Sequence, residues 1–193
     1  MQNVRTLALT AAILGGSAFI GGPAGVAFAE DKSTTIGTPL EVSSPTFKEG
    51  EPISNDHFWN NFGCSGGNKL PDLTWSAGPE GTQSYAVTFY DHDAPTGSGF
   101  WHWVIYNIPA DIRAIKNGEL PAGSVEGNTD LGKPGFFGPC PPKGRKHRYT
   151  FTVHALSVPK LDVDKASTAA LTGFFIYQNT LAKGEINGYG GPR

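Results

Sequence analysis

Short apolar runs separated by long glycine- and proline-rich segments are the feature that most constrains the fold of this chain. In residues 84–90 and 147–158, large apolar side chains alternate with smaller or polar ones. A period of two is typical of β-strands that bury one face. With 26 Gly and 15 Pro in 193 residues, the segments between these runs favour turns and loops over a helical bundle.

Other segments complete this pattern. Further strands are expected at residues 40–47, 70–75, 101–108 and 181–189. Residues 54–69 and 117–145 are rich in Gly, Asn or Pro and are expected to be mostly loop. One segment has helical character, because Ser167 and Thr168 are good capping residues ahead of a run that extends to Ile176. The sequence therefore predicts a mostly β sandwich with one late helix.

The N-terminal 29 residues are interpreted as a secretory signal peptide. Arg5 is the only charged residue before position 30, residues 7–20 are apolar, and Ala27-Phe28-Ala29 fits a cleavage site. A membrane anchor is the alternative, but the apolar run is short and interrupted by glycine. We expect a signal peptide at 1–29, one domain at 30–193 without a membrane span, and a periplasmic or secreted location.

The overall charge excludes one class of partner. The formal net charge is −2 and the isoelectric point is about 6.2, so the chain lacks the basic surface typical of nucleic-acid binding. Four basic residues between positions 143 and 148 form a short patch. We interpret this patch as a solvated turn.

Cys64 and Cys140 are the only cysteines. In an exported protein such a pair is readily oxidised to a disulfide, and no metal-binding spacing competes for them. The alternative is two separate buried thiols.

Polar residues that are unfavourable to bury cluster at three strand ends. The clusters are Asp91-His92-Asp93-Ala94-Pro95, Trp101-His102-Trp103, and Gly138-Pro139-Cys140-Pro141-Pro142 with His147-Arg148-Tyr149. Loops at strand ends can converge on a cavity, and a proline-rich loop suits a preformed pocket wall.

These three motifs, in this order, resemble the phosphatidylethanolamine-binding protein (PEBP) family, and most closely its bacterial Raf-kinase-inhibitor-like branch. The resemblance extends over residues 38–190. It implies a β-sandwich of two antiparallel sheets with one or two short C-terminal helices and a small anion pocket. The family's pocket positions carry over to Asp91, Asp93, Pro95, His102, Gly138, His147 and Tyr149. We place His92, Trp101 and Pro139 at the pocket rim, and His92 stands where the family usually has proline.

The chemistry of these residues suits a phosphorylated head group such as phosphoethanolamine. His102, His147 and Tyr149 can donate hydrogen bonds to an anion. Asp91 and Asp93 can orient an imidazole or meet an ammonium group. No cofactor and no metal are expected, because the histidines lack the usual zinc-binding spacings.

Two other functions stay open at this point. The same His/Asp pocket could serve a hydrolase-like enzyme, although the chain has no Gly-x-Ser-x-Gly motif. The chain could instead inhibit or regulate a secreted protease or another protein partner, as members of the family are described to do. Members of this branch often form dimers, so the resemblance leaves a homodimer open, although the sequence itself does not determine the oligomeric state.

Overall fold

The computed structural model describes residues 37–193, so the predicted signal peptide at 1–29 lies outside the described residues. In chain order the elements are β1 (Val42–Ser43), β2 (Glu51–Pro52), the 3-10 helix η1 (Asn55–His57), β3 (Leu73–Trp75), β4 (Ser84–Asp91), β5 (Phe100–Pro109), β6 (Ala114–Ile115), β7 (Val125–Glu126), β8 (His147–Leu156), α1 (Ala169–Asn179) and β9 (Thr180–Gly190). No helix within 37–193 is long and apolar enough to cross a membrane.

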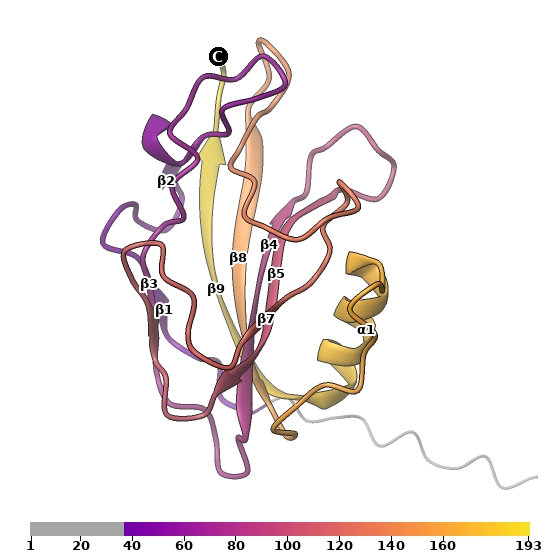
Figure 1. Ribbon diagram of the computed structural model, residues 1–193. Helices are drawn as coiled ribbons and strands as arrows, with labels where there is room; N and C mark the ends of the chain where they lie inside the picture. Colours follow the sequence, from indigo (N-terminus) through magenta and orange to yellow (C-terminus); the bar gives the residue numbers. More distant parts are fainter. Residues whose placement is uncertain (1–36) are drawn as a thin grey trace, which may run out of the picture. The chain divides into compact units, whose positions relative to one another are not determined.

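The strands form two sheets, which confirms the predicted sandwich. A small sheet has the order β1-β3-β6, and a large sheet has the order β2-β9-β8-β4-β5-β7. The strand pairs are antiparallel except for the edge pair β2–β9, which is parallel. Figure 1 shows the small sheet and α1 on opposite sides of the large sheet.

Each face of the large sheet contributes to a different core. Side chains from both sheets form the larger cluster, in which Phe89 of β4 stacks on Phe151 of β8 with ring centroids 4.0 Å apart. A second cluster contains Ala86, Leu156 and Ile176, and it packs α1 against the other face. The alternation read from β4 and β8 therefore assigns their faces correctly.

Helix α1 begins where the capping residues predict. The Thr168 hydroxyl accepts a hydrogen bond from the Leu171 N–H at 3.2 Å, which satisfies one of the free donors at the helix start. At the other end, Thr180 donates to the Ile176 carbonyl at 2.8 Å and opens strand β9 directly. The outer face of α1 exposes Leu171, Phe174 and Tyr177.

The shortest elements were missed by sequence reasoning. Strands β2, β6 and β7 have two residues each, and η1 has three. Such elements are too short to show a period in the sequence. Strand β7 lies inside the segment 117–145 that was expected to be mostly loop, and it pairs with the edge of β5.

Candidate functional site

Strand β4 ends on Asp91, which is only 3% exposed between β5 and β8. Its Oδ2 atom accepts a hydrogen bond from His147 Nδ1 at 2.8 Å and lies 3.9 Å from His102 Nε2. Its Oδ1 atom accepts the backbone N–H of Asp93 at 2.9 Å. One buried carboxylate thus orients the His147 imidazole and holds the start of the next loop. It lies at the centre of the predicted site.

A β-bulge in β5 brings His102 to this carboxylate. The register between β4 and β5 shifts by one residue between Phe89 and Tyr90, which leaves His102 as the extra residue of β5. His102 packs against Phe89 and Tyr149, which belong to the inter-sheet core. Its neighbour Trp103 is buried in the same core, so the two consecutive residues share one face of the large sheet. Regular alternation would place two consecutive residues on opposite faces, so the bulge is what directs His102 into the site.

Both imidazoles of the cluster use their Nδ1 proton within the protein. His102 Nδ1 donates to the Phe137 carbonyl at 2.8 Å, because a carbonyl oxygen can only accept. His147 Nδ1 donates in the same way to the Asp91 carboxylate. In the neutral rings, each Nε2 atom therefore carries a lone pair. The expectation that both rings donate to a ligand holds only for their protonated forms.

Burial lowers the pKa of His102 and favours its neutral form. The hydrogen bond to the Phe137 carbonyl and the charge of Asp91 act in the opposite direction but are weaker. At neutral pH and above, His102 is therefore a neutral ring whose Nε2 lone pair faces a carboxylate oxygen 3.9 Å away.

The Tyr149 hydroxyl is buried and has no hydrogen-bond partner within residues 37–193. Tyr149 is the cross-strand partner of Asp91, and its ring centroid lies 5.4 Å from that of His102 and 6.3 Å from that of His147. Burial raises the pKa of this hydroxyl, and the Asp91 carboxylate raises it further through its charge and as a close acceptor. The O–H and the carboxylate are not aligned for a hydrogen bond in this structure. A buried O–H without a partner is unfavourable by about 1–3 kcal/mol, so this atom needs an acceptor.

Asn68, which sequence reasoning missed, holds the loop segment whose carbonyl accepts the hydrogen bond from His102 Nδ1. Its Nδ2 donates to the Phe136 carbonyl at 3.1 Å, and its Oδ1 accepts the Gly138 N–H at 2.8 Å. These bonds lie on either side of Phe137, whose carbonyl binds the His102 ring. Asn68 has a φ of 49°, in the left-handed region that Asn tolerates better than most residues. A lone Asn in a loop gives no signal of this role in the sequence.

Gly138 and Pro139 are packing positions in the loop before β8. A Cβ atom added at Gly138 would lie 1.8 Å from the His57 carbonyl oxygen, so only glycine fits there. Its N–H is already donated to Asn68. Pro139 is buried, and its carbonyl accepts the Trp59 N–H at 3.1 Å. Pro139 therefore lies in a wall of the site rather than at an exposed rim.

A cavity of about 340 Å³ opens beside His147. It is lined by Asp93, Pro95, Pro142, Arg145, Lys146 and His147. Asp91, His102 and Tyr149 do not line it and are connected to it through the His147–Asp91 hydrogen bond. Arg145 and Lys146 come from the basic patch that was interpreted as a solvated turn. Their position directly before His147 was the signal in the sequence that could have placed them at the site.

Asp93 has a different environment from Asp91. It is exposed, and its Oδ2 accepts the Arg148 backbone N–H at 2.7 Å. This bond connects the loop after β4, which contains Pro95, to the start of β8, and both segments line the cavity.

His92 and Trp101 lie on the other face of the large sheet, so they do not form the rim expected of them. His92 Nε2 donates to Thr150 Oγ1 at 2.8 Å, since that hydroxyl gives its own proton to Asn187 Oδ1. Both side chains line a separate cavity of about 190 Å³. The physical reason is alternation along β8, which points Thr150 away from the side that Tyr149 occupies.

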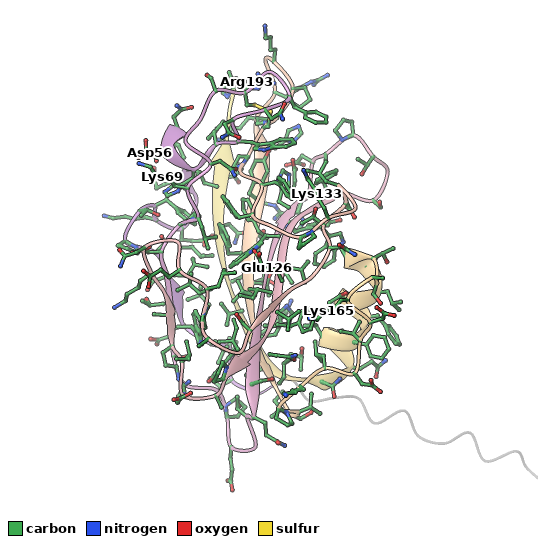
Figure 2. The ribbon with its side chains drawn as sticks, viewed as in Figure 1. Asp56, Lys69, Glu126, Lys133, Lys165 and Arg193 are labelled. Atoms are coloured by element: carbon green, nitrogen blue, oxygen red, sulfur yellow. A yellow bond between two sulfur atoms is a disulfide. The ribbon has the colours of Figure 1, made fainter. Side chains whose placement is uncertain are left out.

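The predicted disulfide between Cys64 and Cys140 is present, with the Cα atoms 5.9 Å apart. It joins the loop after η1 to the proline-rich loop before β8. The C-terminal residue Arg193 reinforces the connection, because its guanidinium donates to the Pro141 carbonyl at 2.5 Å and to the Gly63 carbonyl at 2.7 Å. Figure 2 shows Arg193 at the end of the domain where these loops gather.

A larger cavity lies elsewhere in the described residues. It measures about 1030 Å³ and contains none of the predicted site residues. The ion pair of Asp56 and Lys69, visible at the edge of the domain in Figure 2, contributes to its wall. Within residues 37–193, no three His, Cys, Asp or Glu side chains are grouped to hold a metal ion.

Comparisons with known proteins identify relatives of this chain. The Escherichia coli K12 UPF0098 protein YbcL is 49% identical over 155 residues, which cover 76% of this chain and 85% of that protein. The E. coli K12 UPF0098 protein YbhB is 42% identical over 153 residues, which cover 76% of this chain and 97% of that protein. A Mycobacterium tuberculosis protein named as a lipoprotein, LppC, is 38% identical over 121 residues, which cover 62% of this chain and 57% of that protein.

A solved structure matches the fold as well. The crystal structure of E. coli YbcL, described as a member of the mammalian PEBP family, matches with a TM-score of 0.74 at 46% identity. The match covers 79% of this chain and 98% of that one. The sequence model of the family described as phosphatidylethanolamine-binding protein matches residues 43–190, and the chain therefore belongs to the phosphatidylethanolamine-binding protein family.

Proposed function

We propose that this chain is an exported protein that binds a small phosphorylated ligand, such as a phosphoethanolamine head group, at the site around Asp91, His147 and Tyr149. The observation that carries the proposal is the buried Tyr149 hydroxyl, which has no hydrogen-bond partner within residues 37–193. It packs against two imidazoles that gain a second N–H donor when protonated. An anionic oxygen is the group that satisfies all three donors.

The neighbouring cavity supports an anion of limited size. Arg145 and Lys146 line it and supply positive charge, which matters because the net charge of −2 gives no long-range attraction for anions. Its volume of about 340 Å³ is at the low end of the roughly 300–1,000 Å³ of small-molecule sites. A head group fits this volume, and acyl chains do not.

We favour ligand binding over catalysis as the function. We also favour export over a location in a reducing compartment. Cys140 is joined to Cys64 and so offers no thiolate nucleophile. Disulfides persist mainly in oxidising compartments, and one relative, LppC, carries a lipoprotein name. Both observations agree with the signal peptide expected at residues 1–29.

Calorimetric titration with phosphoethanolamine between pH 5 and pH 7 tests the proposal. We expect binding that strengthens as the pH falls, because protonated imidazoles donate from both nitrogens. The double variant Arg145→Gln/Lys146→Gln should weaken binding by about 10-fold or more, equivalent to about 1.4 kcal/mol. Arg148→Gln is the matched control, since it removes one charge from the opposite face of β8 and should leave the affinity unchanged. Absence of binding across this pH range would overturn the proposed function.

A further inference from the structure

The inner part of the site holds two hydrogen-bond acceptors that face each other. Asp91 Oδ2 and His102 Nε2 are 3.9 Å apart. The Phe137 carbonyl takes the Nδ1 proton of the neutral His102 ring, so Nε2 presents its lone pair. The Asp91 carboxylate is also an acceptor only. A donor placed between these two atoms could bond to either of them. Because both residues are deeply buried, leaving the two acceptors without a donor between them is more unfavourable than it would be in water.

The surrounding groups do not supply that donor. His147 gives its Nδ1 proton to Asp91 Oδ2 from the β8 side, and the Tyr149 hydroxyl does not reach Asp91 in hydrogen-bond geometry. The remaining charged groups near the pair are Asp93 on the exposed loop after β4, Asp130 acting on His102 from the segment after β7, and Arg145 and Lys146 on the cavity beyond His147. Two of these four are carboxylates, which add acceptors to the site instead of donors.

We propose that the site selects anions that still carry an ionisable proton, such as the monoanion of a phosphate monoester, over anions that carry none, such as sulfate. This inference rests on the proposed function. The ligand's own O–H donates to Asp91 Oδ2 or His102 Nε2, and the Tyr149 hydroxyl donates to another oxygen of the same ligand. A fully deprotonated anion would place a further acceptor against Asp91 and His102.

The proton requirement separates three probes of similar size. Sulfate carries no proton at any pH of the experiment, whereas inorganic phosphate keeps at least one from pH 5 to pH 8. Methyl phosphate, which has no ammonium group to act as a substitute donor, loses its last proton with a pKa of about 6. Titration of the imidazoles affects phosphate and methyl phosphate alike, so a difference between the pH responses of these two probes reports the ligand's own proton.

The experiment is calorimetric titration of the full chain with the three probes at pH 5 and pH 8, at matched ionic strength. At pH 8, where His102 is neutral and both ions are mainly dianions, we expect phosphate to bind about 30-fold more tightly than sulfate, which corresponds to about 2 kcal/mol. Between pH 5 and pH 8 the affinity for methyl phosphate should fall about 10-fold more than the affinity for inorganic phosphate. Equal affinities for sulfate and phosphate, or equal pH responses of phosphate and methyl phosphate, would overturn this inference and leave the proposed anion site intact.

A variant reduces the selectivity. Asp91→Asn keeps the size of the side chain but turns the Oδ2 position into an amide donor, so the neutral His147 ring accepts at Nδ1 and carries its proton on Nε2. With one acceptor fewer in the site, sulfate should bind more tightly and the preference for phosphate should shrink to a few-fold. Its folding is checked by circular dichroism and thermal unfolding, and the wild-type comparison above decides the matter even if the variant is unstable. If none of the three probes nor phosphoethanolamine binds the wild type, the proposed function itself is wrong, and this inference with it.

Discussion

Replacing Asn68 with alanine should destabilise the fold and release the His102 ring from its single tautomer. The variant removes the acceptor of the Gly138 N–H and the donor to the Phe136 carbonyl. Without these bonds, the Phe137 peptide is no longer held against His102 Nδ1. Asn68 therefore acts on the site as a positioning residue, through the backbone of the loop.

The magnitude follows from the contacts. Gly138 is buried, so leaving its N–H without a partner costs about 1–3 kcal/mol, and the loss of the bond to Phe136 costs about 1 kcal/mol more. Alanine at a φ of 49° adds about 1 kcal/mol of backbone strain. The free energy of unfolding should fall by about 4 kcal/mol in total. For a domain of this size, that corresponds to a decrease in Tm of roughly 8–16 °C.

Asn117→Ala is the matched control. Asn117 has a φ of 56° and is exposed, and it bonds to Asp72 through its backbone N–H, so the variant bears only the strain of about 1 kcal/mol. Urea unfolding measures both stabilities, and nitrogen-15 NMR of the imidazoles identifies which nitrogen of His102 carries the proton. We expect Nδ1–H alone in the wild type and in Asn117→Ala, and a mixture of tautomers in Asn68→Ala. Equal stabilities of the two variants, with His102 unchanged in both, would refute the role assigned to Asn68.

Three further predictions concern stability. The double variant Cys64→Ser/Cys140→Ser should lose about 4 kcal/mol in urea unfolding, as the chain-entropy relation gives for a separation of 76 residues; equal stabilities of oxidised and reduced protein would contradict this. Burial lowers the pKa of His154 to about 3, and the charge of Lys183 adds to the effect. Between about pH 6.5 and pH 3, His154 is therefore protonated in the unfolded state but not in the folded state. The free energy of unfolding should therefore decrease as the pH falls from about 6.5 toward 3, by at most about 1.4 kcal/mol per unit, and the slope should be shallower in His154→Gln. Thr168→Ala should lower the stability by about 1 kcal/mol in thermal unfolding, because the Leu171 N–H loses its cap, whereas Ser167→Ala should have little effect.

The sequence contained enough to predict the two-layer fold. The alternation along β4 and β8 identified which side chains enter the inter-sheet core, because these strands are long and each has neighbours on both sides. The capping residue Thr168 identified the start of α1 from one local interaction. The two-residue strands β2, β6 and β7 could not be found in this way, because they are defined by their pairing with β9, β3 and β5 and not by a pattern of their own.

The cluster around Asp91 was predictable in its residue types but less so in its geometry, and its role as a binding site stays a prediction. Motifs at strand ends identified Asp91, His102, His147 and Tyr149, which the structure brings into one cluster. The same motifs also suggested His92 and Trp101, but a residue adjacent to a site in sequence points to the opposite face of a strand unless a bulge intervenes. His102 has such a bulge and His92 does not, and nothing in the local sequence distinguishes the two cases.

Protonation is the property of the site that most depends on distant parts of the chain. The resemblance to the family suggested that the histidines donate hydrogen bonds to an anion. The tautomer of His102 is instead set by the Phe137 carbonyl, which Asn68 holds from a loop far away in the sequence. That contact turns a presumed donor into an acceptor facing Asp91. Under the selectivity that we propose, an anion that enters this site brings its own proton, so the selectivity would follow from a loop contact and not from the identity of the histidines alone.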